Sequence, residues 1–285
     1  MNPTAVLKIH CDDQSGLVAV VTQVLYDKGA NILDAQQHRE ELDDQFFMYV
    51  KFECDKLNCT KEELRQSIEV CAQKHQMKHS LTFSEQHQKI AIMVSKYDHC
   101  LYDLLLRHKY GEFPNTDIEL VVSNHPDLAN VADHFGIPFE VIPKNKDTRI
   151  EADEKALTLF QKYEINLIIM ARYMQIVTPV LLDAYPNKVI NVHHGFLPAF
   201  KGAKPYHQAY EKGVKLIGAT SHYATVDLDM GPMIEQETER IDHSHCVDDM
   251  IRIGRGIESK VLAHAVKAHC EKRIIVYKNR TIIFN

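Results

Sequence analysis

Three side chains that can stabilise charge at a carbonyl group stand in two short segments of this 285-residue chain. Asn191 and His193 come at the end of an apolar run that has the composition of a buried strand. Asp229 stands in a turn of sequence Thr-Val-Asp-Leu-Asp-Met-Gly-Pro. Alternation along a strand sends Asn191 and His193 to one side and Val192 to the other, so an amide and an imidazole share one space.

These groups fit acyl transfer without a covalent intermediate. The amide and a protonated His193 can bind the oxygen that becomes an oxyanion when a nucleophile adds to a carbonyl carbon. A carboxylate beside the histidine can orient the attacking group or remove its proton. The residue types alone leave an alternative open, in which Asn191 and one of His193 and His194 satisfy backbone groups while Asp229 only makes the turn.

Composition limits the class of protein. The formal net charge is −6, which argues against a nucleic-acid partner because such proteins carry a basic face. No apolar run approaches the roughly 18 residues that cross a bilayer, and the first residues lack the pattern of a signal peptide. The seven cysteines include no CxxC pair, which indicates reduced thiols and the cytoplasm. No histidine stands in a metal-ligand spacing such as HExxH, so no metal is expected.

The first 84 residues have the pattern of a small separate domain. Apolar spacing predicts strands over 6–11, 32–38, 46–52 and 77–83, and helices over 17–28 and 60–71. The order βαββαβ is that of a ferredoxin-like sheet with both helices on one face. The polar residues 85–88 are the expected linker.

Residues 89–285 are expected to form a second, larger α/β domain. Apolar runs alternate with helical patterns, which predicts a doubly wound, mostly parallel sheet. The predicted buried strands are 89–94, 118–122, 139–142, 167–170 and 189–192. Strands over 216–223 and 233–237 should be antiparallel additions at one edge, before a helix over 247–270 and a closing hairpin. Ligands bind at the C-terminal ends of strands in such sheets, which is where Asn191 and His193 stand.

The segment from Asn191 to Gln236 resembles the signature region of the folate-dependent formyltransferase superfamily. It contains an Asn-x-His…Leu-Pro motif, a Gly-x-Thr-x-His stretch and an Asp-x-Gly-Pro turn. The resemblance extends from about Lys89 to the C-terminus. The His-His doublet, the stretch Phe-Leu-Pro-Ala-Phe-Lys-Gly-Ala and a preceding ACT-like domain over 1–84 resemble the formyltetrahydrofolate deformylase family in particular.

That resemblance implies an enzyme that hydrolyses 10-formyltetrahydrofolate to formate and tetrahydrofolate with no tightly bound cofactor. It implies that Asn191 and His193 polarise the formyl oxygen, and that Asp229, next to Gly-Pro, positions water and shuttles protons. It also implies a folate pocket lined by the backbone of Arg172, Tyr173, Met174, Gln175, Ile176 and Val177. A loop of Thr225, Val226, Asp227 and Leu228 would close this pocket. The formate would supply purine biosynthesis, and the reaction would balance the one-carbon folates.

The residues also bear on what accepts the formyl group. A transferase that holds a phosphorylated acceptor needs a glycine-rich turn whose N–H groups face the anion. The corresponding turn here has no glycine and contains the bulky Tyr97 and the acidic Asp98. His99, in the same turn, can exclude an acceptor, hold water or only cap the next helix.

A transferase acting on transfer RNA would be expected to carry a basic accessory domain, and none is expected here. Water is therefore the expected nucleophile. A formyltransferase to a small non-phosphorylated amine is the first alternative, and a catalytically inert folate or amino-acid sensor is the second.

The N-terminal domain resembles ACT domains, in which an effector loop enters a helix after a strand. The corresponding loop contains Asp13, Gln14, Ser15, Gly16 and Leu17. Backbone N–H groups at a helix N-terminus can bind an amino-acid carboxylate. The resemblance implies glycine or methionine as effector and a homo-oligomer formed by edge-to-edge pairing. An equally open alternative is that this domain binds nothing and serves only assembly.

Overall fold

The computed structural model describes residues 3–199, 202 and 204–285. Phe200, Lys201 and Ala203 of the signature region, and the first two residues of the predicted N-terminal domain, lie outside this part. The chain divides into two compact units, the first made of Met1–His87, Lys272–Ile275 and Ile282–Asn285, and the second of Gln88–Glu271 and Val276–Thr281.

This division differs from the predicted one at two places. Both ends of the closing hairpin, formed by β12 (Ile274–Tyr277) and β13 (Arg280–Ile283), belong to the first unit, whereas the sequence assigned all of 89–285 to one domain. Gln88 is the first residue of a strand and not part of the linker. A hairpin so short has no periodic signal that would tell which domain it joins.

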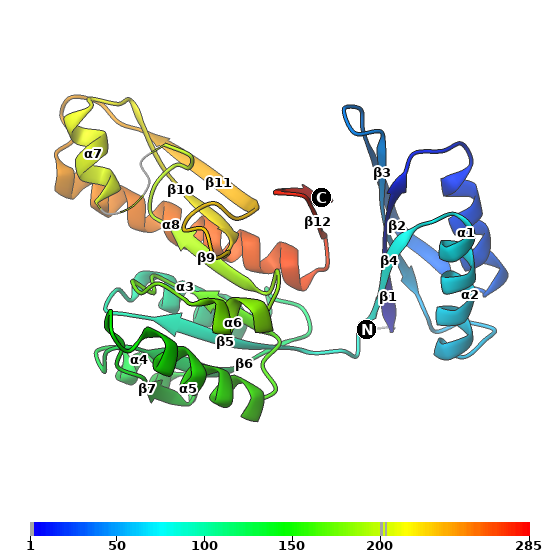
Figure 1. Ribbon diagram of the computed structural model, residues 1–285, viewed down its shortest axis with the longest axis horizontal. Helices are drawn as coiled ribbons and strands as arrows, with labels where there is room; N and C mark the ends of the chain where they lie inside the picture. Colours follow the sequence, from blue (N-terminus) through cyan, green and yellow to red (C-terminus); the bar gives the residue numbers. More distant parts are fainter. Residues whose placement is uncertain (1–2, 200–201, 203) are drawn as a thin grey trace. The chain divides into compact units, whose positions relative to one another are not determined.

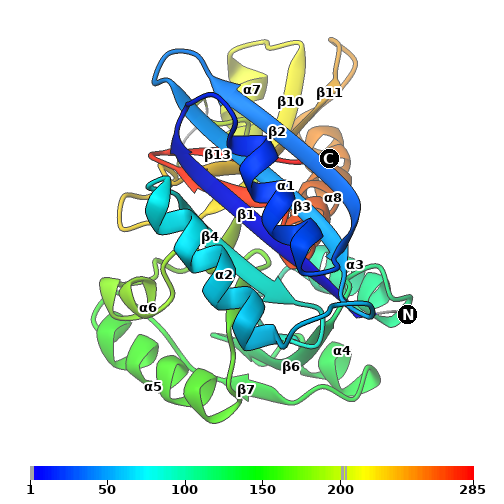
Figure 2. The ribbon, with the colours of Figure 1, turned by 90° about the vertical axis from the view of Figure 1, so that its right-hand side faces the viewer.

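The first unit is the predicted ferredoxin-like domain. Its elements are β1 (Thr4–Asp12), α1 (Leu17–Asp27), β2 (Asn31–Glu40), β3 (Gln45–Glu53), α2 (Lys61–Lys74) and β4 (Lys78–Phe83). The antiparallel sheet has the order β2-β3-β1-β4, and α1 and α2 lie on the same face of it (Figure 1, Figure 2). Alternation along β1 turns Leu7 and Ile9 into the core, and the side chain of Thr60 caps the N-terminus of α2.

The second unit contains a seven-stranded sheet of order β11-β10-β9-β8-β5-β6-β7. The strands are β5 (Gln88–Val94), β6 (Thr116–Ser123), β7 (Phe139–Val141), β8 (Leu167–Met170), β9 (Val189–His193), β10 (Leu216–Tyr223) and β11 (Met233–Arg240). Strands β5 to β9 run parallel, and β10 and β11 are antiparallel additions at one edge. The predicted fold class is confirmed.

Helices cover both faces of this sheet. They are α3 (His99–Lys109), α4 (Ala129–His134), α5 (Arg149–Lys162), α6 (Pro179–Ala184), α7 (Pro205–Glu211) and α8 (Val247–Cys270). On one face Phe160 of α5 packs with Ala91 and Met93 of β5. On the other face α8 contacts β9, β10 and α3 (Figure 1). The sequence did not predict α6 and α7, because helices of six and seven residues are too short for a periodic pattern.

The order in which strands are added reverses at β5. The chain first places β6 and β7 on one side of β5, then returns to place β8 and β9 on the other. Open α/β sheets bind ligands in the crevice at such a reversal, outside the C-terminal ends of the strands. The segments that leave these ends are residues 95–98 after β5 and 171–178 after β8. A ligand site is therefore expected between these two loops.

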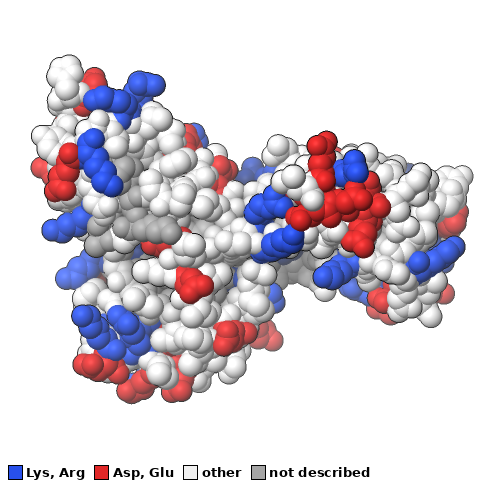
Figure 3. All heavy atoms as spheres, turned by 45° about the horizontal axis from the view of Figure 1, so that its top comes forward, with Lys and Arg blue, Asp and Glu red and all other residues white. Residues whose placement is uncertain are grey.

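The apolar lengths of the helices, the surface charges and the cysteines can each be compared with what the sequence predicted. Among the helices that the structure describes, none has an apolar stretch long enough to cross a membrane. On the face seen in Figure 3, the first unit shows a cluster of acidic side chains with basic ones beside it, whereas the second unit shows acidic and basic side chains scattered among neutral ones. All seven cysteines are free thiols.

Candidate active site

The C-terminal end of β9 and the turn before β11 bring Asn191, His193 and Asp229 together. His193 and Asp229 are buried, and Asn191 is half-buried beside them. His193 Nδ1 lies 3.3 Å from Asp229 Oδ2, which fixes the plane of the imidazole ring. The three side chains that the sequence singled out therefore face one space.

A fourth side chain, His222 of β10, joins this group and was not among the predicted catalytic residues. Antiparallel pairing of β9 and β10 sets Asn191 opposite His222. The carbonyl oxygen of Tyr223, 3.0 Å from His222 Nδ1, can only accept, which assigns the proton to Nδ1. Nε2 lies 3.1 Å from Asn191 Nδ2 and 3.8 Å from Asp229 Oδ1, so the ring contacts both side chains.

The backbone of the turn sets the position of Asp229. This residue has a φ of 56°, in the left-handed region that aspartate and asparagine enter more readily than most residues. A Cβ atom at Gly231 would lie 1.8 Å from the carbonyl oxygen of Tyr223, so only glycine fits there. Thr225 Oγ1 donates to the carbonyl of Asp227 at 3.0 Å and closes the loop. The turn thus buries one of its two carboxylates and exposes the other.

Two titratable groups of the site have shifted pKa values. Burial alone would raise the pKa of Asp229, but the rings of His193 and His222 outweigh it and hold the pKa below the usual range of a carboxyl group. Asp229 is therefore ionised throughout the neutral range. Burial, followed by the nearby charge of Arg172, lowers the pKa of His194 to about 3, so this imidazole is neutral.

The predicted folate-binding stretch lies at the sheet reversal. Arg172 is the second residue after β8 and is buried, whereas Met174 and Ile176 expose apolar side chains. Ser95, at the end of β5, accepts a 3.0 Å hydrogen bond from the backbone N–H of Met174. The loop after β8 is thereby tied to the loop after β5.

The predicted closing loop also exposes apolar side chains, Val226 and Leu228. Ala224, at the start of this loop, packs against the core cluster that contains Tyr173 and Val177. The two loops predicted to bind folate therefore pack against the same part of the core. Their exposed apolar side chains are suited to contact with a flat aromatic ring such as a pterin.

A buried ion pair fixes the far end of the loop after β8. The side chains of Lys144, which follows β7, and of Asp153 on α5 are in contact and are both buried. Asp153 Oδ2 also accepts a 2.7 Å hydrogen bond from the backbone N–H of Thr178, the residue that precedes α6. Lys144 Nζ lies 5.6 Å from the centre of the Tyr173 ring. Residues 172–178 are thus held at both ends.

A second buried cluster, centred on Glu258 of α8, was not predicted. Glu258 accepts hydrogen bonds from the Tyr206 hydroxyl group and from the His99 ring, each at 2.8 Å. Arg172 Nε lies 3.3 Å from the same carboxylate. Burial would raise the pKa of Glu258, but His99 and Arg172 outweigh it and lower the pKa. The carboxylate is therefore charged and balanced inside the protein.

His194 connects the two clusters. Its ring packs edge-to-face on Tyr206, with the centroids 6.2 Å apart. Its centroid also lies 5.4 Å from that of His193. The Glu258 cluster therefore adjoins the space that Asn191, His193 and Asp229 face.

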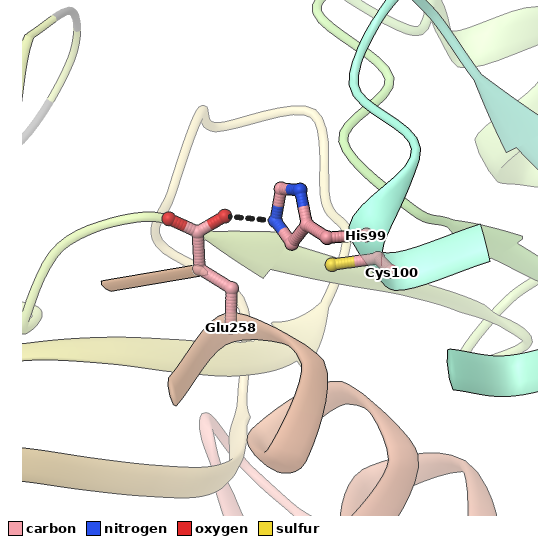
Figure 4. A group of neighbouring side chains, drawn as sticks. All are labelled: His99, Cys100 and Glu258. Carbon is pink, nitrogen blue, oxygen red and sulfur yellow. Dashed lines mark hydrogen bonds and ion pairs between the residues drawn. The ribbon is translucent and has the colours of Figure 1, made fainter. Parts of the chain in front are cut away.

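The same cluster contains three groups that could ligate a metal, on His99, Cys100 and Glu258 (Figure 4). Their ligand atoms all lie within 4.8 Å of one another. Arg172 already balances the charge of Glu258, and His99 donates to it. Burial raises the pKa of Cys100, which keeps a thiol where metal binding needs a thiolate. These donors are suited to an internal ion pair more than to a cation.

Gly254 makes room for the Tyr206 hydroxyl group, since a Cβ atom there would lie 2.0 Å from its oxygen. Gly254→Ala should therefore destabilise the protein, although alanine inside a helix usually adds about 1 kcal/mol over glycine. Gly256→Ala, on the same helix with open space around it, is the matched control and should stabilise. Thermal unfolding followed by circular dichroism compares the two. Equal stabilisation by both would show that Tyr206 does not need this space.

Comparison with known proteins identifies the chain. The Formyl transferase family model matches residues 88–266, and the ACT domain model matches residues 5–69. A formyltetrahydrofolate deformylase of Synechocystis sp. is 44% identical over 283 residues, which cover 99% of each chain. The chain belongs to the formyltetrahydrofolate deformylase family. The crystal structure of a formyltetrahydrofolate deformylase from Pseudomonas syringae matches it with a TM-score of 0.96 and 38% identity, over 100% of this chain and 95% of that one.

Membership of the formyltetrahydrofolate deformylase family makes the chain a hydrolase and confirms the resemblance seen in the sequence. Glycinamide ribonucleotide transformylase 1 from Symbiobacterium toebii also matches, at 26% identity and a TM-score of 0.67, over 72% of this chain and 98% of that one. The deformylases match the chain over nearly its whole length, and the transformylase does not. The fold of the second unit is therefore shared with a transferase, and the choice of acceptor must depend on side chains.

Proposed function

We propose that Asn191 and His193 stabilise the oxyanion that forms at the formyl group of 10-formyltetrahydrofolate, and that Asp229 positions the attacking water and shuttles protons. The observation that carries this proposal is the contact between His193 and Asp229 beside Asn191, at the C-terminal edge of the sheet. Donors held in place before the reaction lower the energy of a developing oxyanion without having to reorganise.

In the proposed reaction, water adds to the formyl carbon and the carbonyl oxygen becomes negative. The side chains of Asn191 and His193 donate to that oxygen. The low pKa of Asp229 makes the carboxylate a weak base toward free water, so it first orients the water. Proton transfer to Asp229 becomes favourable as the bond to carbon forms and the water becomes acidic. The bond from carbon to the folate nitrogen then breaks, that nitrogen takes the proton, and formate leaves.

Purified protein incubated with 10-formyltetrahydrofolate and no acceptor tests this function. Formate and tetrahydrofolate should appear in equal amounts. If the formyl group stayed on the folate until an amine was added, the protein would be a formyltransferase to a small non-phosphorylated amine. No turnover in either case would leave a binding protein.

We also propose that the reaction needs no tightly bound cofactor, since the side chains above supply the donors and the carboxylate that hydrolysis requires. The free thiols favour the cytoplasm, a reducing compartment. The net charge of −6 favours neither nucleic acid nor an anionic membrane surface as a partner. In the cytoplasm the formate would supply purine biosynthesis, and the release of tetrahydrofolate would balance the one-carbon folates.

We propose further that the first unit binds glycine or methionine. Asp13, Gln14, Gly16 and Leu17 line one groove together with Arg39. Gly16, at a φ of 91°, precedes α1, whose first N–H groups can bind a carboxylate. Calorimetric titration of the whole protein with each amino acid should detect binding. A separate assay should show a changed rate of formate release when that amino acid is present. No heat and no rate change with either would leave this unit the role of forming a homo-oligomer, which sedimentation would detect.

A further inference from the structure

Arg172 adopts a backbone conformation that costs energy for its residue type. Its φ is 63°, in the left-handed region where glycine is favoured. Non-glycine residues held in such conformations concentrate at functional sites, because the surrounding structure must compensate for the strain. Arg172 is also buried, which is uncommon for arginine unless its charge is paired. The position therefore demands an explanation beyond chain geometry.

The side chain of Arg172 spans the crevice at the sheet reversal. It starts at the end of β8, and its guanidinium carbon lies 4.8 Å from the centre of the Tyr97 ring, in the loop after β5. On its other side Nε lies 3.3 Å from Glu258 of α8. Arg172 thus joins the two loops that border the expected ligand crevice to α8. The side chains of Arg172, Tyr97 and Glu258 therefore occupy this part of the crevice.

The filled part adjoins the reaction centre. His194, which directly follows the proposed catalytic His193, lies against Tyr206, and Tyr206 donates to Glu258. Within the part of the chain that the structure describes, Arg172 Nη1 is buried and makes no hydrogen bond, whereas Nε is paired with Glu258. A buried N–H group without a partner is costly, and a water molecule is the smallest group that removes this cost. A water molecule bound to Nη1 would lie in this cluster, which adjoins the reaction centre.

We propose that Arg172, held by Tyr97 and Glu258, closes the acceptor side of the active site and restricts the nucleophile to water. This inference rests on the proposed hydrolysis of 10-formyltetrahydrofolate. If the space were open, an amine nitrogen could attack the formyl carbon, the bond from carbon to the folate nitrogen would break, and a proton from the amine would pass to that nitrogen. A formamide and tetrahydrofolate would form, with no oxidant or reductant.

The test measures how the formyl group divides between water and an amine. Wild type and Arg172→Gly are incubated with 10-formyltetrahydrofolate and excess glycinamide, and both formate and formylglycinamide are quantified by mass spectrometry. Glycine suits the left-handed backbone at this position, so the substitution removes the side chain and also relieves strain. The ratio of formylglycinamide to formate should rise at least about tenfold, the size of a modest steric discrimination in a pocket.

Arg172→Lys is the matched control, since it retains length and charge, and its ratio should stay near that of wild type. Tyr97→Ala removes the exposed ring against which Arg172 packs, and should raise the ratio in the same direction even if Arg172→Gly does not fold. A reaction without enzyme sets the background of direct formylation.

A wild-type ratio in folded Arg172→Gly, or in Tyr97→Ala where Arg172→Gly does not fold, overturns the proposal. Loss of both products in folded Arg172→Gly also overturns it, because Arg172 would then be needed for the chemistry and not for the choice of nucleophile. Failure of the proposed function would be seen separately, as wild-type protein that forms no formate without glycinamide.

Discussion

Replacing Asp229 by asparagine should lower the rate of formate release by about 10²- to 10⁴-fold, the range expected for loss of a group that transfers protons. The variant keeps the shape of the side chain and loses the charge that orients water. The substitution should not disturb the backbone, because asparagine enters the left-handed region at φ 56° as readily as aspartate. The low pKa of Asp229 keeps the wild-type carboxylate ionised near neutrality. Asparagine has no group that ionises in this range, so raising the pH should not restore the lost charge or the rate.

Single-turnover formate release and folate binding should be measured separately, since the variant is expected to bind folate and fail in the chemical step. Asp227→Asn changes the exposed carboxylate of the same turn, and should leave kcat within a few-fold, with any larger effect confined to KM.

His193→Ala should lower the rate of formate release on the order of 10²-fold, as loss of one oxyanion donor does. A rate near that of wild type for Asp229→Asn would mean that the carboxylate is misassigned.

Most strands could be predicted because burial on both faces leaves an apolar run in the sequence. Residues 89–94 and 167–170 are such runs, and they became β5 and β8 at the centre of the sheet. Helix α8 has the predicted bounds, since 24 residues give several turns of periodic pattern. The sequence did not indicate that both ends of the closing hairpin group with the first unit, because packing between distant segments leaves no local signal.

The site was predicted as far as local patterns reach. Alternation put Asn191 and His193 on one side, and the family resemblance selected Asp229. His222 was not predicted as a site residue because its place opposite Asn191 depends on strand register, which the sequence alone does not give. Glu258 was not predicted because its partner His99 lies 159 positions away in the sequence, too far for a local pattern to relate them. The one available signal was a carboxylate next to Ile257, on the apolar side of α8.

Removing Asp153 should be among the most damaging single changes to stability, at about 3–5 kcal/mol, because it leaves the charge of Lys144 buried without its partner. Lys155→Ala on the same helix is the matched control. Its partner Glu151 is exposed, as Lys155 itself is, so the loss should stay within about 0.5 kcal/mol. The chain has no tryptophan, so urea unfolding should be followed by circular dichroism.

The effect of Asp153→Ala should reach folate binding as well. The backbone N–H of Thr178 loses its acceptor, and the loop that begins at Arg172 loses its far anchor, so KM should rise more than kcat falls in the variant that remains folded. Adding Lys144→Met to Asp153→Ala removes the unpaired charge and should recover part of the stability without recovering KM. Recovery of both would mean that the buried charge alone disturbs the loop, whereas a loss no larger than that of Lys155→Ala would contradict the anchoring role altogether.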